Sequence, residues 1–312
     1  MSVIGKVAYH FYFRPRSWFN NISKFGGITN ILKIENGRNA MTNAAQQLFV
    51  NVPAAPATDI YFLTGKKYWA LTAFCMYSLT EASTIPLRPI FIDDGSFDEG
   101  FIKKIKSQFP GCIIKLSAEI ELIISQKLPA DKYPCLHKKR SVYPHIKKLI
   151  DVHIGAAGWK MVLDSDMLFF KPPIEIYNWL NNPEQPFFLY DPITSYHYSL
   201  SLMEELAGNK INPNINVGAA GLKSEDIDWD KLECWVKTLE EKQGTSYLLE
   251  QALTAMLVAG KEIIIADKAE YIVMPDKKEV QNPTGVLHHY VAQSKEYYFT
   301  ISWKHILKPI NA

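Results

Sequence analysis

The chain has 312 residues, of which 47% are hydrophobic and 21% charged, as expected of a globular protein with a large core. Its formal net charge of +2 gives no global basic field that would indicate a nucleic-acid partner, and no apolar run approaches the length of about 18 residues that predicts a membrane span. The four cysteines (Cys75, Cys112, Cys135 and Cys234) stand far apart without CxxC spacing. This pattern argues against a zinc site and predicts reduced thiols in a cytoplasmic protein.

Residues 1–56 differ from the rest of the chain. Aromatic and basic side chains are concentrated in residues 10–19, and Pro53 and Pro56 mark a boundary with the next unit. The aromatic-basic stretch has three candidate contacts: a membrane surface, a partner, or the body of the protein itself. We expect the last, so that residues 1–56 form an N-terminal extension that packs on a catalytic domain spanning residues 57–312.

From residue 58 the pattern alternates between short apolar runs and helical periodicity. It predicts strands at residues 60–63, 87–92 and 112–116, with helices at residues 68–79 and 101–109 between them. Such alternation is typical of an α/β fold built on a parallel, Rossmann-like sheet. Ligands of these sheets bind beyond the carboxyl ends of the strands.

Polar turns follow the first two predicted strands. Thr64 and Gly65 end the first strand, and Asp93 and Asp94 end the second. Because the carboxyl ends of parallel strands meet at one edge of a sheet, we expect these turns to lie close together. A plain β-turn is the alternative for the second pair, since Asp-Gly is a common turn sequence.

Another apolar run, residues 159–163, leads directly into Asp164-Ser165-Asp166 and is followed by a further apolar run at residues 167–170. The flanks predict a buried, central, parallel strand. Burying two carboxylates at the end of such a strand is costly unless a cation or hydrogen-bond donors neutralise them. Hard divalent cations such as Mg²⁺ take oxygen ligands and bind through one or two carboxylates together with substrate phosphates. The pair therefore predicts a metal–phosphate site, and solvated acids in a turn are the alternative.

A basic segment at residues 137–150 precedes this acid pair. We interpret it as a helix, and its cations would neutralise a diphosphate held by the metal. Arg140 is the candidate we name for that contact. For its lysines the favoured interpretation is a solvated helix face.

The ordered set of these features resembles the GT-A fold of nucleotide-sugar-dependent glycosyltransferases. Strands ending in a Thr-Gly turn and an Asp-rich turn, a basic segment and an Asp-x-Asp strand come in the order of that fold. The segment from Asn214 to Leu222, the pair Glu250-Gln251, and His289 followed six residues later by Lys295 resemble motifs of its glycogenin-like (family 8) branch. Two features depart from that branch: Ala292 stands where its last motif has glycine, and the Asp-rich turn is more similar to inverting, family 2 enzymes.

The resemblance implies a metal site and roles for its residues. Asp166 would bind the metal, Asp164 the metal or a ribose, and His289 would complete the metal's ligands while Lys295 meets the diphosphate. His288 is the alternative to His289, because alternation on a strand turns only one of the two toward the site. The implied cofactor is Mn²⁺ or Mg²⁺.

The resemblance also implies donor and acceptor contacts. Asp93 or Asp94 would face the base or ribose, and Asn216 the donor sugar. The expected donor-binding set is Thr64, Gly65, Asp93, Asp94, Arg140, Asp164, Ser165, Asn216, Gly218 and Lys295. For activation of the acceptor the candidates are Glu250, Gln251 and Asp191.

We therefore expect an α/β protein with a mixed, mostly parallel GT-A sheet flanked by helices. Its expected activity is metal-dependent transfer of a sugar from a UDP- or GDP-sugar to a glycan, a lipid-linked saccharide or a small molecule. The expectation includes no nucleic-acid partner and no membrane span, but leaves room for peripheral membrane contact. Two alternatives are another metal–phosphate enzyme such as a nucleotidyltransferase, and a GT-A module that binds nucleotide sugars without catalysis.

Overall fold

The computed structural model describes residues 27–52 and 57–307. The aromatic-basic stretch at residues 10–19, and Pro53 and Pro56, lie outside the described residues. The predicted extension is therefore described only at residues 27–52. There the helix α3 (Ile28–Ala44) and the short segment after it contribute apolar side chains, such as Met41 and Leu48, to the core of the body. No helix among the described residues is both long and apolar enough to cross a bilayer.

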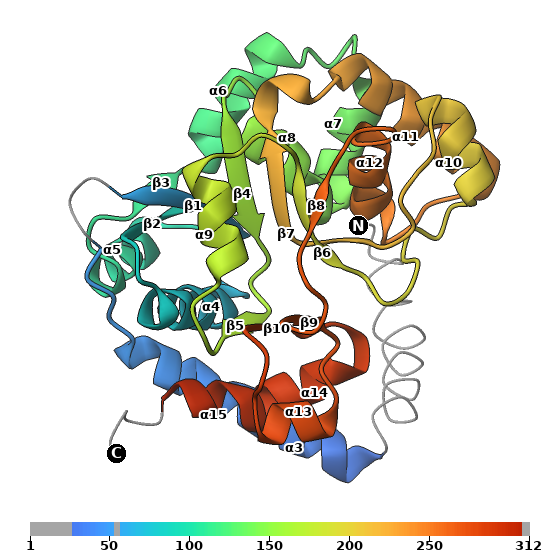
Figure 1. Ribbon diagram of the computed structural model, residues 1–312. Coiled ribbons are helices and arrows are strands. Elements are labelled where there is room, and N and C mark those ends of the chain that lie inside the picture. The colour runs from blue at the N-terminus through green and yellow to red at the C-terminus, as the bar shows by residue number, and fades with distance from the viewer. Residues whose placement is uncertain (1–26, 53–56, 308–312) are drawn as a thin grey trace.

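The main sheet has seven strands in the order β3-β2-β1-β4-β7-β6-β8 (Figure 1). Strands β3, β2, β1 and β4 are parallel, whereas β7 runs antiparallel to both of its neighbours, β4 and β6. The strands are β1 (Thr58–Thr64), β2 (Leu87–Asp93), β3 (Ile113–Lys115), β4 (Trp159–Leu163), β6 (Phe187–Tyr190), β7 (Ile215–Lys223) and β8 (Ile264–Ile265). The predicted mixed, mostly parallel α/β sheet is confirmed.

A second, smaller sheet has the order β5-β10-β9, formed by β5 (Met167–Phe169), β9 (Tyr271–Val273) and β10 (Leu287–His289). Strand β10 is antiparallel to β5 and parallel to β9. The two apolar runs on either side of the acid pair thus belong to different sheets. The first is β4 in the middle of the main sheet, and the second is β5 in the small sheet. The chain turns from one sheet to the other at residues 164–166.

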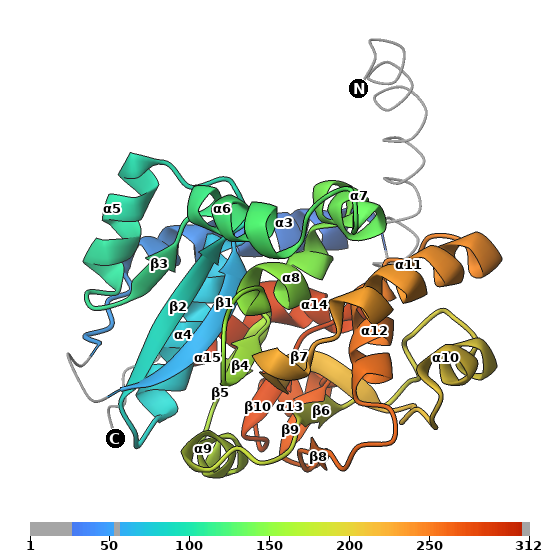
Figure 2. The same ribbon diagram turned by 90° about the horizontal axis from the view of Figure 1, so that it is seen from above.

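Helices cover both faces of the main sheet (Figure 2). One face packs against α6 (Ser117–Lys127), α7 (Pro134–Val142), α8 (Lys147–His153), α10 (Leu200–Ala207), α11 (Trp229–Gln243) and α12 (Leu249–Leu257). The other packs against α3, α4 (Trp69–Ala82), α5 (Glu99–Gln108), α9 (Ile174–Asn181), the small sheet, α13 (Lys277–Gln281), α14 (Lys295–Tyr297) and α15 (Trp303–Ile306). The core is therefore two apolar layers, one on each side of the sheet.

The basic segment differs from the single helix that we expected. It is divided into α7, a 3-10 turn (Pro144–Ile146) and α8. Proline has no N–H to donate and disfavours a helical conformation in the residue before it, so the helix ends at Val142 and restarts after the turn. The interruption places the arginine and the lysines of this segment on different helices.

Candidate functional site

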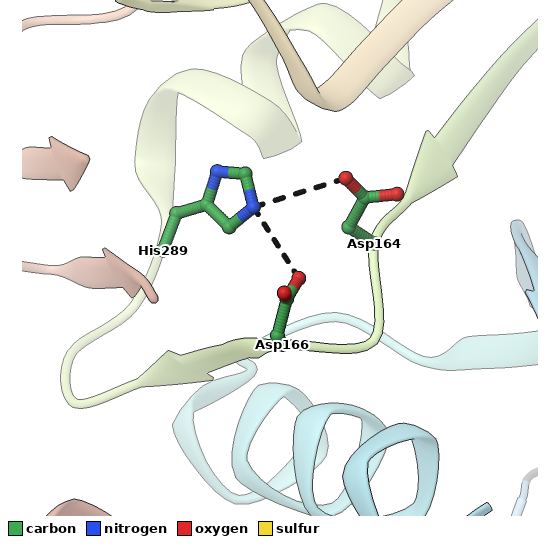
Figure 3. Close-up of side chains that lie close together, drawn as sticks. All are labelled: Asp164, Asp166 and His289. Carbon is green, nitrogen blue, oxygen red and sulfur yellow. Dashed lines mark ion pairs between the residues drawn. The ribbon is translucent and has the colours of Figure 1, made fainter. Parts of the chain in front are cut away.

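The acid pair lies at the carboxyl end of β4, where the two sheets meet (Figure 3). The backbone N–H of Asp164 donates to the carbonyl of Gly218 on β7 (2.7 Å), and the carbonyl of Asp166 accepts from the N–H of Tyr290 (2.9 Å). Because β10 pairs with β5 so that His289 lies opposite Met167, its imidazole faces the same turn. Three segments that are far apart in the sequence thus deliver their side chains to one point.

Asp164, Asp166 and His289 have ligand atoms that all lie within 4.8 Å of one another. The Nε2 atom of His289 is 3.3 Å from Oδ1 of Asp166 and 3.8 Å from Oδ2 of Asp164. This buried nitrogen has no hydrogen-bond partner. Two carboxylates and an unpartnered imidazole nitrogen fit a divalent cation of the Mn²⁺ or Mg²⁺ kind, because an ion between them would satisfy all three.

The orientation of the imidazole is fixed by Asn216. Its side-chain Nδ2 donates to Oδ2 of Asp191 (3.3 Å), and its Oδ1 accepts from the N–H of Gly218 (3.0 Å), so the amide has one consistent orientation. Oδ1 of Asn216 is also 3.0 Å from Nδ1 of His289. An amide oxygen only accepts, so Nδ1 carries a proton and Nε2 is the ring nitrogen that faces the carboxylates.

Gly218 permits this arrangement. A Cβ at this position would lie 2.4 Å from both Cε1 and Nδ1 of His289, closer than any real contact. The imidazole therefore packs directly on the backbone of β7, and only glycine leaves it room. We expected a close backbone approach at Gly218, and its partner is the histidine.

Two lysines neutralise the acid pair. Nζ of Lys148, a buried residue of α8, is 2.9 Å from Oδ1 of Asp164 and 2.9 Å from the carbonyl of Val217. Burial alone would lower the pKa of Lys148, but the carboxylates around it outweigh burial and raise the pKa. Lys295 lies 2.9 Å from Oδ2 of Asp166, and burial of Asp166 is likewise outweighed by His289 and Lys295, which lower the pKa of its carboxyl group. Asp166 is thus held as a carboxylate.

Glu250 opens α12 behind Lys148. Its carboxylate is buried and lies 3.8 Å from Nζ of Lys148. Burial raises the pKa of Glu250 to about 7, although Lys148 acts in the opposite direction. A carboxyl group of this kind is poised between its acid and base forms near neutral pH.

The other acceptor-side candidates form one hydrogen-bonded group. Nε2 of Gln251 donates to Oδ2 of Asp191 (2.9 Å) and to the carbonyl of Ile215 (3.0 Å). Since Asp191 also accepts from Asn216, a continuous chain of contacts runs from Gln251 to His289. Asp191 also accepts from the N–H of Ile193, the turn contact expected of its sequence.

The predicted polar turns converge on the same edge. Thr72, on α4, links two of them, since its hydroxyl is 2.6 Å from Oγ1 of Thr64 and 2.7 Å from Oγ of Ser165. The backbone N–H of Asp94 donates to the carbonyl of Thr64, and a Cβ on Gly65 would lie 1.9 Å from Oδ2 of Asp94. Gly65 therefore allows this carboxylate to approach.

Asp93 and Asp94 differ in what they offer a ligand. The buried carboxylate of Asp93 accepts backbone N–H groups from Gly95, Phe97 and Ser117, so it holds the turn together. Asp94 is only half-buried. Of the two acids named from the sequence, Asp94 is the one available to a ribose or base.

Two predicted candidates do not join the cluster. The guanidinium of Arg140 makes a two-point contact with Asp151 and a further contact with Glu121. His288 faces away from the site, where it contacts Glu279 (2.8 Å) and the hydroxyl of Tyr290 (3.0 Å). The alternation of β10 thus leaves His289 as the candidate ligand.

Three further side chains lie near the acid pair although no sequence motif indicated them. Lys148, and not Arg140, is the cation of the basic segment that reaches the acid pair. His145 and Tyr247 have ring centroids 4.7 Å apart, and the charges of Asp164 and Asp166 act on the pKa of both. Tyr247 is 67% exposed, and nothing in its sequence context indicated a place beside the site.

The sheet order and the position of the site define the GT-A fold, and the structural relatives of the chain are glycosyltransferases. An active-site mutant of LgtC superposes with a TM-score of 0.50 at 16% identity, covering 74% of this chain and 86% of that one. LgtC, described as a galactosyltransferase in a complex with donor and acceptor sugar analogues, gives 0.49 at 14% identity over 80% and 100%.

Mouse xyloside xylosyltransferase 1, in its apo form, gives a TM-score of 0.49 at 10% identity, covering 75% of this chain and 98% of that one. No family model matches the sequence, and no curated protein matches it. The superposition on the LgtC mutant, at 16% identity, shows the fold alone, and that fold is the GT-A fold predicted from the sequence.

Proposed function

We propose that the protein is a metal-dependent glycosyltransferase that moves a sugar from a nucleotide-diphosphate sugar, either a UDP- or a GDP-sugar, to a hydroxyl group of an acceptor. The acceptor classes that we consider are a glycan, a lipid-linked saccharide and a small molecule. The observation that carries the proposal is the buried, unpartnered Nε2 of His289 facing Asp164 and Asp166. The shared fold with LgtC, itself named a galactosyltransferase, supports it.

Asp164, Asp166 and His289 would hold Mn²⁺ or Mg²⁺. When bound, the metal offsets the negative charge that develops on the leaving diphosphate. Lys295, which contacts Asp166, is placed to do the same, since a bound cation would release its side chain, which is 43% exposed, toward a phosphate oxygen. Lys148 stays buried beneath Asp164 and fixes its carboxylate.

The donor's nucleoside would occupy the edge formed by the turns after β1 and β2. Thr64, Gly65 and Ser165 shape that edge, and Asp94 offers a carboxylate to the ribose or base. Asn216, whose amide contacts Asp191, Gly218 and His289, acts as a positioning residue for His289. The reacting sugar would then lie near Glu250, Gln251 and Asp191, and Glu250 is the one of these whose pKa suits proton transfer near neutral pH.

We also propose a cytoplasmic location for the reaction. All four cysteines are free thiols, including Cys234, which is exposed. Free thiols are typical of proteins in a reducing compartment.

Release of free UDP or GDP from a panel of nucleotide sugars, measured with Mn²⁺ and after chelation, tests the function. We expect metal-dependent release with one donor and, for Asp166→Ala, loss of that release and of the metal-dependent thermal shift given by the donor. Asp226→Ala is the matched control, because Asp226 is an exposed acid that pairs only with Lys261 on the surface. Full transfer activity in the Asp166 variant would refute the proposal, and donor binding without release or transfer would indicate a non-catalytic module.

A further inference from the structure

Two exposed rings, Tyr247 and His145, lie near the acid pair but take no part in the metal site. Tyr247, in the loop between α11 and α12, is 67% exposed. His145 is also exposed, and its ring centroid is 4.7 Å from that of Tyr247 at an interplanar angle of 76°. It stands on the 3-10 turn between α7 and α8, which packs against α12. The proline that interrupts the basic segment, Pro144, thus brings His145 to Tyr247.

The backbone around Tyr247 is fixed from several sides. The hydroxyl of Tyr143 donates to the carbonyl of Tyr247 (2.5 Å) and accepts from the backbone N–H of Glu250 (3.3 Å). Within the loop, Oγ of Ser246 accepts from the backbone N–H of Leu248 (2.9 Å). The ring is therefore presented from a fixed backbone and supported by a neighbouring ring. A preorganised aromatic side chain of this kind loses little conformational entropy when it contacts a ligand.

These contacts place Tyr247 on the acceptor side of the site. Tyr143 joins its backbone to that of Glu250, the carboxyl group suited to proton transfer. Although most of Tyr247 is exposed, desolvation of its hydroxyl end raises the pKa of the phenol, and the charges of Lys295 and Asp166 also act on it. The open ring thus borders the space through which an acceptor hydroxyl group would approach the metal site.

The chemistry of an open tyrosine ring suits one kind of acceptor. A pyranose ring presents a face of C–H groups, and an aromatic ring offers a flat apolar surface with a negative face to match it. We propose that Tyr247, supported by His145, is the platform on which the acceptor lies, and that the acceptor is a saccharide, either free or linked to a lipid. This inference rests on the proposed glycosyltransferase function and selects among its acceptor classes.

Binding of saccharides to the full chain, measured by saturation-transfer NMR titration with and without Mn²⁺ and UDP or GDP, tests the proposal. The probes are lactose, maltose, cellobiose and N-acetyllactosamine, each also as its octyl glycoside, so that free and lipid-linked acceptors can be distinguished. We expect the wild type to bind at least one of them. Tyr247→Ser should weaken that binding about tenfold, the scale of a lost aromatic contact, whereas Tyr247→Phe should keep most of it. His145→Ala should cause a smaller loss, because it removes only the support of the ring.

Leu122→Ser is the matched control, because Leu122 is an apolar side chain of α6 with nearly the same exposure, 66%, and its loss should leave saccharide binding unchanged. The metal-dependent thermal shift with donor, and release of UDP or GDP without an acceptor, should be the same in Tyr247→Ser and the wild type. Absence of both in the wild type would refute the glycosyltransferase function, while saccharide binding still reports on Tyr247 by itself.

Three results would overturn the proposal. The first is that no saccharide of the panel binds the wild type, and the second is equal binding by the wild type and Tyr247→Ser. The third is a Tyr247→Ser variant that keeps saccharide binding but loses donor binding, which would assign the ring to the nucleoside of the donor.

Discussion

The two ends of β4 carry buried polar clusters of opposite character. At its start, Nζ of Lys160 donates to Oγ of Ser224 (2.8 Å) and to the carbonyl of Ala157 (2.7 Å), and Nδ1 of His153 lies 3.0 Å from the same Oγ. At its end, a second cluster contains His289, Lys148 and residues of β7. There, however, Nε2 of His289 is left without a partner and faces two carboxylates.

This difference separates a structural cluster from a functional one. Both clusters use a lysine, a histidine and a polar residue on or directly after β7 (Asn216 and Ser224), so residue type alone does not distinguish them. At the start of β4 the polar atoms satisfy one another, as buried groups must if they serve only the fold. At the end of β4, Nε2 of His289 has no partner and is available to a metal ion. Burial also raises the pKa of the nearby Glu250 to about 7. An unpartnered metal-binding atom and a shifted pKa are typical of a functional site, so the cluster at the end of β4 is the functional one.

Among changes that leave the three candidate metal ligands in place, we expect the largest effect at Gly218. In Gly218→Ala the new Cβ would collide with the His289 ring and push it off the line toward the acids. Mutating a residue that only supports a metal ligand typically lowers metal affinity ten- to hundredfold. Displacing the ligand itself should cost more, so we expect metal affinity to fall by roughly a hundredfold or more. Titration of Mn²⁺ against the purified variant, followed by the thermal shift with donor, measures it.

Gly221→Ala is the matched control for that variant. Gly221 lies on the same strand, and its Cβ would meet the ring of Trp179 at 2.5 Å instead of the histidine. This overpacking should cost about 1–3 kcal/mol of stability while leaving metal affinity unchanged. Equal loss of metal binding in both variants would show that β7 acts through general distortion and not through His289.

The two ends of β4 should also respond to pH with opposite sign. Burial raises the pKa of Glu250 from 4.5 to about 7. The folded protein therefore binds this proton more tightly than the unfolded chain does. The resulting stabilisation of the fold is complete below pH 4.5 and is lost as the pH rises through 7. Glu250→Gln should therefore stabilise the fold at pH 8 by about 1–3 kcal/mol and change little at pH 4.5. Urea unfolding at the two pH values checks this. A variant that is less stable than the wild type at pH 8 would contradict it.

At the start of β4 the sign is reversed. Burial, aided by Lys160 and Lys115, lowers the pKa of His153 to about 3, so the unfolded chain binds the proton more readily between pH 6.5 and 3. Stability should fall as the pH drops through this window, and His153→Gln should remove that part of the acid sensitivity. The same urea series at pH 6.5 and pH 4.5 provides the comparison.

A smaller effect is expected from Ser224→Ala. The change removes the hydroxyl that joins Lys160 to His153 and leaves both buried groups short of a partner, which costs about 1–3 kcal/mol. Metal and donor binding should be unchanged, because this cluster lies at the other end of the strand. If Ser224→Ala lost donor binding while keeping full stability, the cluster at the start of β4 would not be purely structural.

The parts of the site that lie next to strand ends could be predicted from the sequence. Asp164, Asp166 and the turns after β1 and β2 follow apolar runs whose period is local, so their shared edge follows from the parallel fold. Alternation likewise showed that only one of His288 and His289 could face the site. The residues that were misjudged depend on tertiary contacts.

Arg140 and Lys148 illustrate that limit. Both belong to one basic run, and the proline that divides it turns Arg140 toward Asp151 and buries Lys148 beneath Asp164. Asn216 is a second case, because its contact to His289 depends on the register between β4 and β7 and on a separate strand, β10. Sequence spacing carries no information on either contact.

The smallest effect that we predict concerns Ala292, which stands where the glycogenin-like motif has glycine. Its φ of 50° lies in the left-handed region, which costs a residue with a Cβ about 1–2 kcal/mol. Ala292→Gly relieves that strain but gives the unfolded chain more freedom, worth about 0.4–1 kcal/mol in the opposite direction. We therefore expect a net stabilisation of about 0.5 kcal/mol by urea unfolding, with unchanged metal affinity. A clear loss of stability would mean that Ala292 makes packing contacts that outweigh its backbone strain, and that the departure from glycine is an adaptation of this chain.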